Sequence, residues 1–252
     1  MEFWHKIMSN KSLIIVFCTL FALQVLAIVK NDLMLDRIAK IVVLPLLLTL
    51  YFARMKYMAN IFLTIFLCSF LGDVFMVFHK NEFTNQLSEV AYLGSYLLLF
   101  GLLIGQLRKV KFEGIISVYL SLIFIINAYL LYVLYGAVKD SFLNDVNLWL
   151  YVGRALILVF LVFLSFALYL TRESKQSILF LLAIACFAFG DVLQYICELY
   201  VYFWLFEVIS VALHLAGLSI FVAYVRNHHR KAVRETVNRG ELSSASSEHA
   251  TA

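Results

Sequence analysis

The sequence CSFLGDV at residues 68–74 returns as CFAFGDV at residues 186–192, so that both segments carry the pattern Cys-x-x-x-Gly-Asp-Val. Each copy places an aspartate inside an apolar run long enough to cross a bilayer, which takes roughly 20 residues. An ionisable side chain at membrane depth is costly, and it indicates a functional site by default. The repeated motif therefore predicts two membrane helices that use their carboxylates together.

The composition of the chain supports a membrane location. Apolar residues make up 63% of the sequence and charged residues only 14%, and the mean hydropathy is +0.92. Soluble domains are usually about 25% charged. We predict an all-α transmembrane helical bundle of eight spans, in which the break near Tyr200 is the weakest boundary. The expected spans lie near residues 12–29, 38–54, 57–79, 87–107, 113–136, 147–171, 176–199 and 201–225.

The basic residues give an orientation for these spans. Lys and Arg accumulate in cytoplasmic loops, and the eight spans place 14 of them on the side of both termini and 5 on the opposite side. This split predicts an integral, multi-pass protein with both termini cytoplasmic, as in a bacterial inner membrane. It also accounts for the net charge of +4, so nucleic acid is not an expected partner.

The chain is predicted to form one domain and a tail. Residues 1–226 are expected to form the eight-helix transmembrane domain, and residues 227–252, which are basic and then serine-rich, a disordered cytoplasmic tail. The two aspartate motifs are four helices apart and so run in the same direction. This relation predicts two parallel four-helix repeats with both aspartates at a similar depth.

Further polar residues fall at or near this depth, with Asn127 at the middle of the membrane and His214 deeper in its span, and they predict a polar cavity open to the outer side. Their expected role is to bind the substrate, and they are Lys40, Glu89, Asn127, Arg154, Glu207 and His214. Other interpretations stay open for several of them. Arg154 could form a buried ion pair with the aspartates, His214 could be a hydrogen-bonded core residue, and Lys40 could reach the membrane interface.

The predicted catalytic pair is Asp73 and Asp191. Two carboxyl groups that share an apolar cavity can differ in protonation near neutral pH, which suits acid/base hydrolysis of an acid-labile bond. The sequence contains no G-x-S-x-G, H-E-x-x-H or Walker motif. No metal or cofactor is therefore expected, and a lipid phosphate is expected to contact Lys40 or Arg154.

These motifs resemble those of the YhhN-type lysoplasmalogenases. The resemblance rests on Leu71-Gly72-Asp73-Val74, on Gly190-Asp191 and on Lys40 followed by Pro45, and it covers most of residues 12–225. It implies cleavage of the vinyl-ether bond of a lysophospholipid, which yields a fatty aldehyde and a glycerophospho-base.

A protein without enzymatic activity is the alternative. An acidic cavity between parallel repeats also suits a small-solute or proton-coupled transporter, or a membrane sensor. The single proline and the position of the carboxylates toward one face favour the hydrolase. The sequence makes no prediction of oligomeric state.

Overall fold

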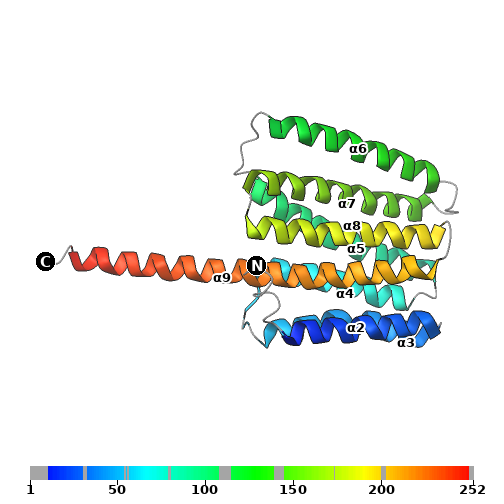
Figure 1. Cartoon of the computed structure of the whole chain (residues 1–252), viewed down its shortest axis with the longest axis horizontal. Coiled ribbons are helices and arrows are strands. Elements are labelled where there is room, and N and C mark those ends of the chain that lie inside the picture. Colours follow the sequence, from blue (N-terminus) through cyan, green and yellow to red (C-terminus); the bar gives the residue numbers. More distant parts are fainter. Residues whose placement is uncertain are drawn as a thin grey trace.

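The structure, a computed structural model, describes residues 11–30, 33–53, 55, 57–78, 81–107, 115–138, 145–172, 174–199 and 203–249. Within these ranges the chain forms eight helices that lie side by side (Figure 1). The predicted all-α bundle is therefore confirmed. The helices are α2 (Lys11–Lys30), α3 (Leu33–Phe52), α4 (Asn60–Val77), α5 (Glu82–Leu107), α6 (Ile115–Val138), α7 (Asp145–Arg172), α8 (Lys175–Leu199) and α9 (Trp204–His249).

The helices of this bundle are those of an integral membrane protein. Among the described residues, α4, α5, α7, α8 and the part of α9 up to His229 are long and apolar enough to cross a membrane. Helices α2 and α6 contain shorter apolar stretches. The uncertain boundary near Tyr200 falls between two helices, because α8 ends at Leu199 and α9 begins at Trp204.

The end of α9 differs from the sequence-based expectation. The segment after residue 226 was expected to be disordered, whereas α9 continues to His249 and projects from the bundle (Figure 1). This stretch lacks proline and contains the good helix formers Ala, Arg, Lys and Glu. Extending a helix that already exists costs much less than nucleating a new one, so the membrane helix can propagate into a polar sequence.

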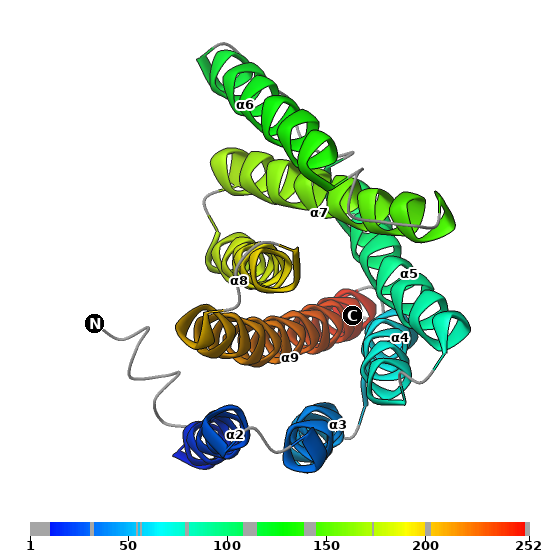
Figure 2. The ribbon, with the colours of Figure 1, turned by 90° about the vertical axis from the view of Figure 1, so that its right-hand side faces the viewer.

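The packing of the helices repeats between the two halves of the chain. Helix α2 packs on α3 as α6 packs on α7, α3 on α4 as α7 on α8, and α4 on α5 as α8 on α9. The contact of α5 with α7 likewise corresponds to that of α9 with α3. Viewed along the bundle, α9 lies near the centre and α6 at the periphery (Figure 2). These four correspondences follow the order that two parallel four-helix repeats predict, whereas the contact of α2 with α9 has no comparable counterpart between α6 and α5 among the described residues.

The two Gly-Asp motifs make the same backbone interaction. The hydroxyl of Ser88 in α5 donates to the carbonyl of Gly72 at 2.8 Å, and that of Ser210 in α9 donates to the carbonyl of Gly190 at 2.9 Å. Glycine permits this close approach, because a Cβ at Gly72 would lie 2.8 Å from the ring of Tyr92. Each motif is thus held against the following helix at a matching position.

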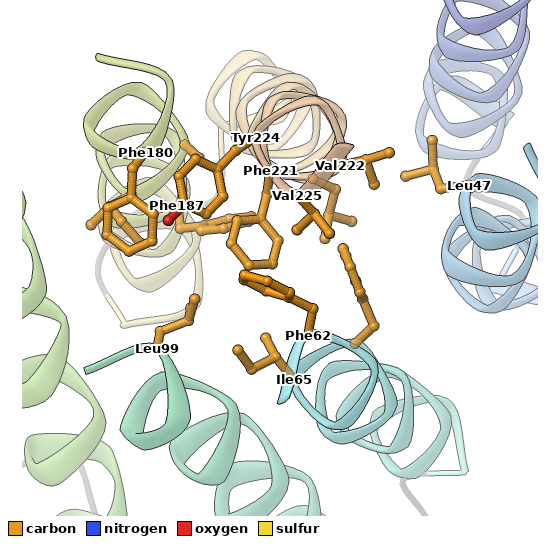
Figure 3. Packing of buried hydrophobic residues seen from close by; sticks show 14 of the residues in the cluster. Leu47, Phe62, Ile65, Leu99, Phe180, Phe187, Phe221, Val222, Tyr224 and Val225 are labelled. Atoms are coloured by element: carbon orange, nitrogen blue, oxygen red, sulfur yellow. The ribbon is translucent and has the colours of Figure 1, made fainter. Parts of the chain in front are cut away.

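An apolar cluster closes the half of the bundle nearer the N-terminus of α4. Phe62 of α4 meets Phe221 and Tyr224 of α9, with Phe180 of α8 beside them (Figure 3). Phe66 of α4 belongs to the same cluster. All five side chains are at most 3% exposed, and the rings of Phe66 and Phe221 lie 5.3 Å apart. The packed aromatic rings leave the other half of the bundle as the place where polar side chains gather.

Candidate functional site

A cavity of about 250 Å³ lies in the other half, toward the connections from α2 to α3, α4 to α5 and α8 to α9. Side chains from α2, α3, α4, α5, α7, α8 and α9 line it. The structure brings together seven of the eight site residues expected from the sequence. They are Lys40, Asp73, Glu89, Arg154, Asp191, Glu207 and His214.

The structure does not place Asn127 at this cavity. This residue lies on α6, which packs on α7 at the edge of the bundle, and it does not line the cavity. Its amide donates to the carbonyl of Ile123 in the same helix at 2.8 Å. An amide in an apolar helix can satisfy its own hydrogen bonds in this way, so its presence alone does not indicate a site.

Asp191 belongs to a buried ionic cluster. The guanidinium of Arg154 donates to Asp191 Oδ2 from Nη2 at 2.9 Å and from Nε at 3.2 Å. Its Nη1 donates to both carboxylate oxygens of Glu89, at 3.1 and 3.2 Å. Asp191 is 2% exposed and Arg154 is 5% exposed. The ion pair that was open as an alternative is therefore present, and it involves Asp191 rather than Asp73.

Tyrosine side chains complete the surroundings of Arg154. The hydroxyl of Tyr96 donates to Asp191 Oδ2 at 3.0 Å. The guanidinium carbon lies 4.6 Å from the ring centre of Tyr92, 5.7 Å from that of Tyr195 and 5.8 Å from that of Tyr96. Three aromatic faces and two carboxylates thus surround the guanidinium. Arg154 is therefore poorly placed to bind a lipid phosphate as well.

Asp73 has a different environment. The hydroxyl of Tyr92 donates to its Oδ1 at 2.5 Å. Among the described residues, no Lys or Arg nitrogen lies within 4.0 Å of this carboxyl group. Asp73 is half-buried at the cavity wall. The two aspartates share one cavity, but only Asp191 is held in an ion pair.

The wall formed by α3 and α9 contributes a cation, a carboxylate and an imidazole. Lys40 Nζ lies 2.8 Å from Asp36 Oδ2, and the lysine side chain is 32% exposed. Glu207 and His214 line the same cavity from α9, and the ring of His214 lies 5.6 Å from that of Phe187. Lys40 has three N–H donors, so its contact with Asp36 leaves it able to bind an anion.

Several residues of the site were missed by sequence reasoning. Tyr92 and Tyr96 are one helical turn apart on α5 and hold the two aspartates. Gln24 lines the cavity from α2. It is a polar amide inside an apolar run, which is the same reason for which Asn127 was expected at the site. Tyrosines are common in membrane proteins. The sequence therefore does not distinguish the few tyrosines that contact a carboxylate from the others.

Comparisons with known proteins do not extend this description. No family model matches the chain, and neither a curated protein nor a solved structure matches it. The interpretation of the site therefore rests on its residues and their geometry.

Proposed function

We propose that this protein is an intramembrane hydrolase that cleaves the vinyl-ether bond of a lysophospholipid, as its resemblance to the lysoplasmalogenases implies. The proposal rests mainly on one observation, which is that Asp73 and Asp191 line the same cavity but have different partners. Among the described residues, Asp73 has one tyrosine donor and no Lys or Arg in contact, whereas Asp191 is fixed by Arg154. A carboxyl group of the first kind can transfer a proton, and one of the second kind supplies a fixed charge.

The proposed reaction begins with proton transfer from Asp73. Because Tyr92 donates to Oδ1, the transferred proton comes from Oδ2. It passes to the vinyl carbon that does not bear oxygen, and the neighbouring carbon becomes an oxocarbenium ion. Water attacks that carbon and returns a proton to Asp73. The resulting hemiacetal loses its glycerol oxygen as an alcohol, while Asp73 protonates that oxygen and accepts the hydroxyl proton. The products are an aldehyde and a glycerophospho-base.

Asp191 has an electrostatic role in this proposal. Its carboxylate shares Arg154 with Glu89, so the cluster contains two carboxylates and one guanidinium. The excess negative charge is preorganised by Tyr96 and Arg154 before the reaction starts. Such a group stabilises a developing positive charge more effectively than water, which must reorient. Lys40 is the cation that we assign to the lipid phosphate.

The closure of the cavity favours hydrolysis over transport. Its inner part borders a pocket of only about 20 Å³ lined mainly by apolar and aromatic side chains, including Phe66, Phe187 and Phe221. Beyond them lies the buried cluster of Figure 3. A lipid hydrolase needs only one opening, whereas a transporter would also need a second state in which this apolar side opens.

The proposal predicts activity toward ether bonds of one kind. Purified full-length protein should release a fatty aldehyde from a lysoplasmalogen. The matched lysophospholipids with an ester bond or a saturated alkyl-ether bond should remain intact, because neither forms an oxocarbenium ion on protonation of a double bond. Aldehyde can be measured by coupled oxidation and the lipids by mass spectrometry. Absence of aldehyde from the folded protein, over a range of pH, would refute the proposal.

We further propose that both termini are cytoplasmic, which would place the cavity in the outer half of the membrane. The 14-to-5 distribution of basic residues supports this orientation. A reporter fused after Ala252 should then be cytoplasmic, and one inserted at Lys139 should be external; both positions lie outside the described residues. Reporters on the same side would contradict the eight-span topology.

A further inference from the structure

We infer that the cavity recognises a primary ammonium group on the lipid head group, and that Gln24 accepts a hydrogen bond from it. The inference rests on the proposed function for the class of lipid, but it concerns binding rather than cleavage. It thus selects an aminoethyl head group over a trimethylammonium head group or an uncharged one.

The first observation is an unsatisfied acceptor. Gln24 is 4% exposed and lines the cavity from α2, yet its buried Oε1 atom has no hydrogen-bond partner within the described part of the chain. A buried polar atom in a native protein nearly always has a partner. Leaving such an acceptor unpaired costs about 1–3 kcal/mol. The geometry therefore points to a ligand that brings a donor to this atom.

The second observation is the charge of the cavity. Four carboxylates line it, from Asp73, Glu89, Asp191 and Glu207, against the two cations Lys40 and Arg154. With a proton on Asp73 and a neutral His214, the three remaining carboxylates still outnumber these two cations. An anionic ligand without a cation of its own would increase this imbalance. A zwitterion that places a phosphate and an ammonium at separate points would reduce it.

The third observation is the position of the groups. Gln24 lies on α2, Lys40 on α3 and Glu207 on α9, and each of these helices packs on the other two. This wall faces the ionic cluster that α5, α7 and α8 contribute. This wall therefore contains one cation for a phosphate and, in Gln24, an unsatisfied acceptor for an ammonium, with the carboxylate of Glu207 on the same wall. A primary ammonium has three N–H donors, whereas a trimethylammonium group has none.

The test is a binding measurement with lipids that cannot be cleaved. Lysophospholipids with a saturated alkyl ether and an ethanolamine, choline or glycerol head group would compete with a radiolabelled ethanolamine analogue for the full-length protein in nanodiscs. We expect ethanolamine to bind about tenfold more tightly than choline, because one hydrogen bond to a charged group is lost. Glycerol should bind more weakly than ethanolamine as well.

Two substitutions of Gln24 separate its role from a packing role. Gln24→Met keeps the length of the side chain and removes the acceptor, so the preference for ethanolamine over choline should disappear. Gln24→Glu keeps an acceptor and adds charge, so the preference should persist or increase. Lys40→Met is the comparison variant, because it should weaken all three phosphate-bearing lipids by a similar factor and leave their order unchanged.

The outcomes distinguish this inference from the proposed function. Equal affinity for the three head groups in the wild-type protein would overturn the inference, even if vinyl ethers are cleaved. So would an unchanged preference in Gln24→Met. A preference that Gln24→Met abolishes would support it, even if no vinyl ether is cleaved and the protein only binds lipid.

Discussion

Asp73→Asn is expected to lower vinyl-ether hydrolysis by about 10²–10⁴-fold, which is the usual contribution of a general acid. Asparagine has nearly the size of aspartate and keeps a carbonyl oxygen for the Tyr92 hydroxyl, which now lies 2.5 Å from Asp73 Oδ1. It cannot deliver a proton to carbon. Because no Lys or Arg is in contact with Asp73 among the described residues, the exchange leaves no buried cation unpaired. Aldehyde release, thermal unfolding and lipid binding should be measured on the same preparation.

The expected pattern is a loss of kcat with little change in unfolding temperature or in affinity for the alkyl-ether analogue. Glu82→Gln is a matched control, since Glu82 is exposed at the start of α5 and accepts a hydrogen bond from Asn147 at 3.2 Å, outside the cavity. That variant should retain wild-type hydrolysis. Wild-type rates in a monodisperse Asp73→Asn protein would show that this carboxyl group takes no part in the reaction.

The fold was predictable because a membrane helix requires a long apolar stretch, which is visible in the amino-acid sequence. Long apolar runs with polar breaks gave the eight helices, since the bilayer requires backbone hydrogen bonds to close within each span. The paired Gly-Asp motifs were enough to predict the repeat. The helical end of α9 was not predicted, because a polar sequence does not reveal that a helix already formed upstream can extend into it.

The members of the site were more predictable than their partners. Depth along a span follows from residue number, at about 1.5 Å per residue, so Asp73, Asp191 and Arg154 could be placed at one level. Which aspartate Arg154 contacts depends on the rotation and order of α5, α7 and α8. No spacing in the sequence records that order. Asn127 lies within a membrane helix as expected, but that helix, α6, does not line the cavity. Gln24 was not expected at the site, although it lies in the cavity wall.

The second large effect is expected on the stability of the protein, when Arg154 is replaced. Arg154→Met removes the guanidinium that pairs with two carboxylates, of which Asp191 is almost fully buried. Removing one partner of a buried ion pair usually costs about 3–5 kcal/mol, because the other charge stays desolvated. An ordinary hydrogen bond between membrane helices contributes only about 0.6 kcal/mol. We therefore expect a large fall in unfolding temperature in detergent, or loss of monodisperse protein.

A second substitution tests whether the loss arises from uncompensated charge. In the double variant Arg154→Met with Asp191→Asn, the buried carboxylate is gone, so its stability should exceed that of Arg154→Met alone. Because the two residues are in contact, their effects should not add. Arg154→Met with wild-type stability and a selective loss of lipid affinity would instead make Arg154 the phosphate-binding cation. Lys40 would then lose the role assigned to it, and the fixed negative charge attributed to Asp191 would need another explanation.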